Sequence, residues 1–78
     1  MTKSEFMELQ ERVGWGEEFS FDYKNEEYWI SQNVDGYYLT RSRDSFIQDF
    51  DTAESLFEKG TIEGQLLSEI YKDIKRLC

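Results

Sequence analysis

Hydrophobic and polar residues alternate from Glu17 to Ser42, and this pattern predicts three antiparallel β-strands in succession. One predicted face is largely apolar and collects Phe19, Phe21, Tyr23, Tyr28, Ile30, Val34, Tyr37 and Leu39. The other collects Glu18, Ser20, Asp22, Trp29, Ser31, Asn33, Tyr38, Thr40 and Ser42. Because side chains in a strand alternate with a period of two, a slip of one residue would exchange these two sets.

Two tight turns are expected to connect the strands. Asp35-Gly36 suits a two-residue type I′ turn, which would place Ile30 opposite Arg41. A second two-residue turn at Asn25-Glu26 would place Phe21 opposite Ile30. The two registers, derived separately, give the same apolar face.

Helical patterns flank these strands. Thr2 and Glu5 have the spacing of a capping box, which predicts a helix over about Lys3–Val13 that Gly14 ends. Trp15 is expected to fold under the connector that follows the helix.

Two further helices are expected after the strands. The same cap spacing at Asp51 predicts a short second helix that ends at Gly60. A broad apolar stripe predicts a third helix from about Gln65 to Leu77. Between the strands and these helices, the segment Ser45–Phe50 fits either a fourth strand or an ordered loop held by two phenylalanines.

The sequence therefore predicts an α+β fold of one domain, residues 1–78. Its core is a three-stranded antiparallel meander, or a four-stranded one, packed on one face by helices in the order α-β-β-β-(β)-α-α. The side of the sheet on which the first helix docks stays open at this point.

The chain of 78 residues carries 17 acidic and 9 basic side chains, for a net charge of −8. Residues 1–27 hold eight of the acids and three of the bases. This negative field repels nucleic acid and anionic membranes, so we expect neither as a partner. Double-stranded-RNA-binding domains share an α-β-β-β-α order, but the charge and the lack of a lysine cluster argue against that function.

Catalytic and metal-binding motifs are absent from the sequence. The chain has no histidine, and its one cysteine, Cys78, is the last residue. Neither an EF-hand loop nor a glycine-rich phosphate loop occurs. We therefore expect no enzyme, no cofactor and no metal site. Without a signal peptide or a long apolar run, a cytoplasmic protein is expected.

Trp29 and Tyr38 are the anomaly of the pattern, because both fall on the polar face of the predicted sheet. Large aromatic side chains in such a position need either a covering element or a partner. Together with Asp22, Glu17 and Glu18 they are the candidate partner-binding residues.

Three function classes remain. The favoured one is a non-enzymatic protein-binding module, of the inhibitor, immunity or antagonist type, that docks a protein partner through this face; the acidic charge suits a basic partner. The alternative is a structural homodimer that buries the same face. A carrier of a small ligand in an aromatic pocket ranks third.

Overall fold

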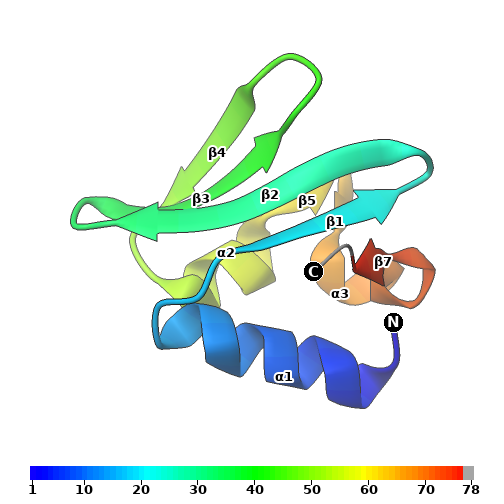
Figure 1. The fold of residues 1–78 in the computed structure, drawn as a ribbon, viewed down its shortest axis with the longest axis horizontal. Helices are drawn as coiled ribbons and strands as arrows, with labels where there is room; N and C mark the ends of the chain where they lie inside the picture. Colours follow the sequence, from blue (N-terminus) through cyan, green and yellow to red (C-terminus); the bar gives the residue numbers. More distant parts are fainter. Residues whose placement is uncertain (77–78) are drawn as a thin grey trace.

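An N-terminal helix, four antiparallel strands and several short elements follow one another along the chain, which a computed structural model describes over residues 1–76 (Figure 1). The elements in chain order are α1 (Lys3–Gly14), β1 (Phe19–Tyr23), β2 (Glu26–Asn33), β3 (Gly36–Arg41), β4 (Phe46–Phe50), α2 (Ala53–Lys59), β5 (Thr61–Ile62), β6 (Gln65–Leu66), α3 (Leu67–Ile70), the 3-10 turn η1 (Tyr71–Asp73) and β7 (Lys75–Arg76). The predicted α+β class is confirmed. The segment that ends at Phe50 forms the fourth strand of the meander.

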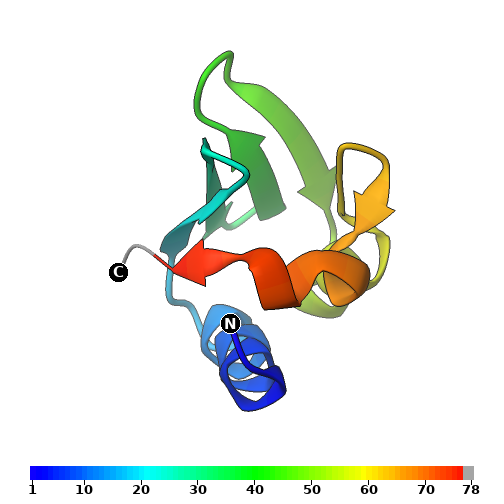
Figure 2. The same ribbon diagram turned by 90° about the vertical axis from the view of Figure 1, so that its right-hand side faces the viewer.

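Five of the strands form one sheet in the order β4-β3-β2-β1-β7, in which all neighbouring pairs are antiparallel, and β5 and β6 form a separate antiparallel hairpin. The helices lie on one side of the meander (Figures 1 and 2). The buried core lies between them and is formed by Phe6, Leu9, Val13, Phe19, Phe21, Tyr23, Tyr28, Ile30, Leu39, Leu56, Phe57, Ile62, Leu67, Ile70 and Ile74. Helix α1 therefore docks on the apolar face of the sheet.

The turn between β2 and β3 lies at Val34-Asp35, so the predicted Asp35-Gly36 turn is wrong by one residue and the register by two. The side chain of Asn33 accepts a hydrogen bond from the Asp35 N–H at 2.8 Å. Asparagine before a turn and glycine after it are typical of a type I turn, in which the two central residues keep negative φ. Val34 therefore lies at the tip and is fully exposed, although the sequence pattern placed it in the core.

The turn between β1 and β2 also lies one residue earlier than predicted. It is formed by Lys24 and Asn25, with φ of 51° and 65°, instead of the predicted Asn25-Glu26. Phe21 consequently pairs with Tyr28 and not with Ile30. A shift of two residues preserves the alternation, so both faces keep almost all of their predicted members.

Helix α1 confirms its predicted start. The side chain of Thr2 accepts from the Glu5 N–H at 3.1 Å, and the Glu5 carboxylate accepts from the Thr2 N–H at 2.8 Å. The helix extends through Gly14, and the left-handed glycine after it is Gly16 at φ 114°. Trp15 does not fold under the connector: it is 66% exposed, so that prediction is wrong.

Helix α2 also forms where expected, although Thr52 and not Asp51 is its N-cap. The hydroxyl of Thr52 accepts from the Ser55 N–H at 3.0 Å.

The predicted third helix is wrong in its extent. Only Leu67–Ile70 is α-helical, and Ile74 is extended at φ −81° and ψ 134° before β7 pairs with β1.

The Met1 amino group donates to the carbonyl oxygens of Tyr71, Lys72 and Ile74 at 3.2, 3.3 and 2.9 Å. The predicted end of the helix, Leu77, and the terminal Cys78 lie outside the described residues.

Candidate partner-binding face

The surface of the sheet that faces away from the helices carries both candidate aromatics; we call it the outer face. Strand alternation assigns to it Ser20, Asp22, Glu27, Trp29, Ser31, Asn33, Tyr38, Thr40, Ile47, Asp49 and Lys75, and Glu18 continues the alternation just before β1. None of the three helices contributes to covering this face, because their buried residues all belong to the core on the other side.

Trp29 lies in a row that crosses four strands. Its neighbours are Ser20 on β1 and Thr40 on β3, and Thr40 in turn pairs with Ile47 on β4. The two turns expected from the sequence would pair Trp29 with Asp22 and Ser42; both pairings are wrong, because each register is shifted by two residues. Trp29 is 48% exposed and Ile47 is 54% exposed. Since neighbouring strands are about 4.8 Å apart, the two apolar side chains flank Thr40 at a separation of roughly 10 Å.

Tyr38 occupies the adjacent row, between Ser31 on β2 and Asp49 on β4. Its ring is half-buried, and its hydroxyl donates to Asn33 Oδ1 at 2.9 Å. Because Asn33 also accepts from the backbone of the β2–β3 turn, one amide group holds both the turn and the phenol. This hydrogen bond fixes the orientation of the Tyr38 ring on the outer face.

The predicted acidic residues separate into two groups. Asp22 lies on the outer face between Glu27 and Lys75, and Glu18 is exposed just before β1 and lines a hollow with Ser20 and Trp29 of this face. Glu17 lies in the connector after α1. Its carboxylate accepts from Arg12 Nε at 3.1 Å and from the Trp15 indole N–H at 2.6 Å. The structure thus brings four of the five candidates, Trp29, Tyr38, Asp22 and Glu18, onto one face.

Ile47 is the apolar member of this face that sequence reasoning missed. The signal was present, because Phe46 and Phe50 alternate with Gln48 and leave Ile47 and Asp49 to point the other way. Only the uncertainty between strand and loop at Ser45–Phe50 prevented that interpretation.

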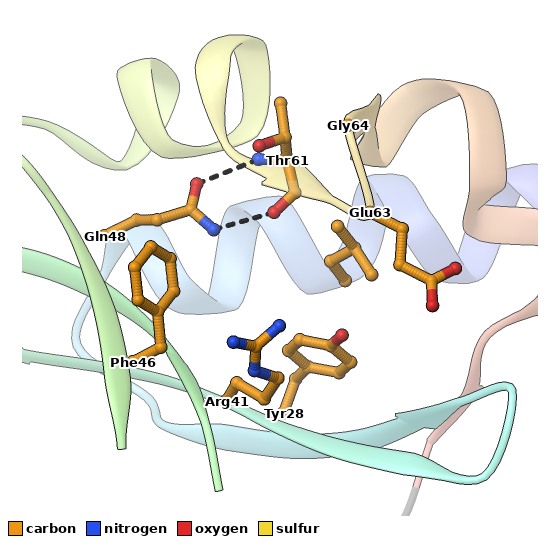
Figure 3. A pocket seen from close by; sticks show the side chains of 8 residues that line it. Tyr28, Arg41, Phe46, Gln48, Thr61, Glu63 and Gly64 are labelled. Atoms are coloured by element: carbon orange, nitrogen blue, oxygen red, sulfur yellow. Dashed lines mark hydrogen bonds between the residues drawn. The ribbon is translucent and has the colours of Figure 1, made fainter. Parts of the chain in front are cut away.

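A separate pocket of about 310 Å³ opens on the other side of the sheet, near Tyr28, Arg41 and Phe46 (Figure 3). Arg41 donates from Nε and Nη2 to both carboxylate oxygens of Asp44, at 2.9 and 2.7 Å. This bidentate pair lowers the pKa of Asp44 from 3.8 to about 2 and raises the pKa of Arg41. Burial raises the pKa of Tyr28.

The polar side chains of this pocket already have partners within the fold. Gln48 bonds the backbone of Thr61 with both ends of its amide group, as Figure 3 shows. Glu63 forms an ion pair with Lys24 at 3.9 Å. The pocket is therefore a junction between the β3–β4 loop and the β5–β6 hairpin, and we assign the candidate site to the outer face.

Within residues 1–76, no group of three or more carboxylate, imidazole or thiol side chains is arranged to hold a metal ion. Across the same part of the chain, every buried side-chain nitrogen or oxygen has a hydrogen-bond partner. No helix in this range has the length and apolar character needed to cross a membrane.

The chain matches no protein-family model, no curated protein sequence and no solved structure. The outer face is therefore the basis for the function proposed below.

Proposed function

We propose that this protein is a non-enzymatic binding module, of the inhibitor, immunity or antagonist type, that docks a basic protein partner through its outer face. The observation that carries the proposal is the exposure of Trp29 and Ile47, at 48% and 54%, on a sheet face that the helices leave open.

Aromatic and aliphatic side chains on an open sheet face resemble the centre of a protein interface. Interface hot spots are enriched in Trp and Tyr, which bury a large area and lose little conformational freedom. Here Trp29 and Tyr38 lie on neighbouring strands, and the hydrogen bond to Asn33 already orients the Tyr38 ring. A partner would therefore bind a preformed surface, which reduces the entropic cost of association.

The charge of the outer face supports a basic partner. Its exposed and half-exposed acids are Glu18, Asp22, Glu27 and Asp49, against Lys75 as the base assigned to it. The chain as a whole carries −8. Complementary charge accelerates encounter and disfavours acidic partners.

Self-association through the same face is the competing hypothesis. Two copies would bring −8 against −8, which opposes a dimer unless buried apolar area compensates. Light scattering on purified protein separates the two hypotheses: our proposal expects a monomer, and a stable dimer that the Trp29→Ser change dissociates would replace it.

The test is affinity capture from lysate of the native host, with three baits compared by quantitative mass spectrometry. These are the wild-type chain, the double variant Trp29→Ser with Tyr38→Ser, and the control Trp15→Ser. The control removes an indole that is 66% exposed but lies outside the outer face. We expect a basic protein that the wild type and the control both retain and the double variant loses. Equal capture by all three baits would refute the proposal.

A further inference from the structure

One end of the outer face is hollowed beside Trp29. The hollow has a volume of about 180 Å³ and is lined by Glu18, Phe19, Ser20 and Trp29. Ser20 lies directly opposite Trp29, and Glu18 precedes Ser20 by two residues, just before β1, and also lines the hollow. Diagonal neighbours across an antiparallel pair are about 7–8 Å apart, a distance that one bound polar group can bridge.

Two polar groups at this hollow are uncommitted. Among the described residues, the Glu18 carboxylate forms no ion pair or hydrogen bond, in contrast to the neighbouring Glu17, which binds Arg12 and Trp15. Over the same residues, the indole N–H of Trp29 has no acceptor, whereas that of Trp15 donates to Glu17. Glu18 and Trp29 thus combine a free negative charge with an exposed aromatic ring.

We propose that this hollow receives an arginine side chain of the protein partner, with the guanidinium stacked on the Trp29 indole and hydrogen-bonded to the Glu18 carboxylate. The proposal rests on the proposed function and specifies how the outer face would recognise a basic partner.

The chemistry favours arginine over lysine. Tryptophan is the aromatic side chain that attracts cations most strongly. A planar guanidinium can stack on a ring and still donate two N–H bonds in its plane to a carboxylate. Ammonium groups are typically held in cages of several aromatic faces, whereas Phe19, the other aromatic residue lining this hollow, is 7% exposed and belongs to the core.

The test uses the whole chain and three short peptides: acetyl-Gly-Arg-Gly-amide, the lysine peptide, and the citrulline peptide as a neutral isostere of arginine. Binding is followed by the NMR signals of the Trp29 indole N–H and the Ser20 amide. We expect saturable shifts with the arginine peptide, weaker binding of the lysine peptide and no saturable shift with citrulline.

Two variants locate the binding. Glu18→Gln should lower the affinity for the arginine peptide roughly threefold, as expected for loss of one exposed ion pair. Glu58→Gln, which removes a charge that is also exposed but lies on α2, should leave the affinity unchanged. Trp29→Leu should weaken binding, measured at the Ser20 amide, roughly fivefold.

Equal binding of the arginine and citrulline peptides would overturn the inference, as would unshifted Trp29 and Ser20 signals at tens of millimolar peptide. The outcome is separable from that of the proposed function. If the double variant loses the captured partner while the arginine peptide does not bind, the docking face stands and the arginine site fails. If the peptide binds in the hollow while capture ignores the double variant, the hollow binds a guanidinium group, but the docking function fails and so does the assignment of the hollow to the partner's arginine.

Discussion

The side chain of Gln48 is hydrogen-bonded to both backbone groups of Thr61. Gln48 Nε2 donates to the Thr61 carbonyl oxygen at 2.7 Å, and the Thr61 N–H donates to Gln48 Oε1 at 3.0 Å. β4 is an edge strand, and β5 pairs only with β6 within the part of the chain that the structure describes. One amide side chain therefore joins the meander to the hairpin that leads into α3.

Replacing Gln48 with alanine should leave both Thr61 groups without this partner. We expect a loss of about 1–3 kcal/mol in the free energy of unfolding, together with faster hydrogen exchange at the Thr61 amide. Urea unfolding and native-state exchange measure the two effects. Gln10→Ala is the control, since Gln10 is also half-buried and forms no such bridge. A Thr61 exchange rate that does not change would mean that the bridge does not hold the hairpin.

A side chain at position 36, in place of the hydrogen of Gly36, should destabilise the fold. Its φ is 156°, and an added Cβ would lie 2.6 Å from the backbone oxygen of Phe50 on β4. Gly36→Ala should therefore cost about 2 kcal/mol or more, through backbone strain and displacement of the edge strand.

Gly14 provides the matched control for that substitution. It lies in α1 with open space at the Cβ position, so Gly14→Ala should stabilise the protein by about 0.5–1 kcal/mol. Thermal or urea unfolding of both variants checks the pair, and a harmless Gly36→Ala would contradict the close approach of β3 and β4.

The Arg41–Asp44 pair predicts a dependence of stability on pH. The pKa of Asp44 is lowered from 3.8 to about 2. The ionised carboxylate therefore stabilises the folded state fully above about pH 4, and this stabilisation is lost as the pH falls through about 2. A ¹³C NMR titration of the Asp44 carboxyl group should give the low midpoint. Arg41→Met should raise it towards the ordinary value, and Arg43→Met should raise it less, because Arg43 acts on Asp44 through charge alone. An unchanged midpoint in Arg41→Met would contradict the bidentate pair.

The alternation of side chains between the two faces is the feature of the sheet that the sequence determines most strongly. Both turns were predicted one residue too late, yet Phe21, Ile30 and Leu39 are buried and Trp29 points away from them. When a two-residue turn moves by one residue along the chain, the pairing of the two strands shifts by two residues. A shift of two leaves every side chain on the same face of the sheet. Val34 was assigned wrongly for a local reason, since the Asn33 side chain selects a turn that starts one residue earlier.

The failure of the third helix has a different cause. Leu67, Ile70 and Ile74 have helical spacing, and all three are buried, but the same spacing also fits one helical turn followed by an extended residue. The free edge of β1 decides between the two, because β7 can pair with it. Such a contact between distant segments is not encoded in a local pattern.

The proposed basic partner predicts an ionic-strength dependence. Exposed charges are screened over about 8 Å at physiological salt, so added salt should slow association of the captured partner. Glu18→Lys with Asp49→Lys should slow it further, whereas Glu54→Lys with Glu58→Lys on α2 should have less effect. Surface plasmon resonance at several salt concentrations measures these rates. Association that ignores ionic strength would remove the electrostatic part of the proposal.

The unfolding free energy of the double variant Trp29→Ser with Tyr38→Ser shows whether these two aromatic side chains serve a partner or the fold. Tyr28, the chain neighbour of Trp29, is 4% exposed on the opposite face and provides the control. In urea, Tyr28→Ser should cost about 3–5 kcal/mol, as for other truncated buried aromatics. The double variant should change the unfolding free energy by less than about 1 kcal/mol, as surface substitutions usually do. A loss comparable to that of Tyr28→Ser would show that the two aromatic side chains are internal packing and not a partner-binding surface.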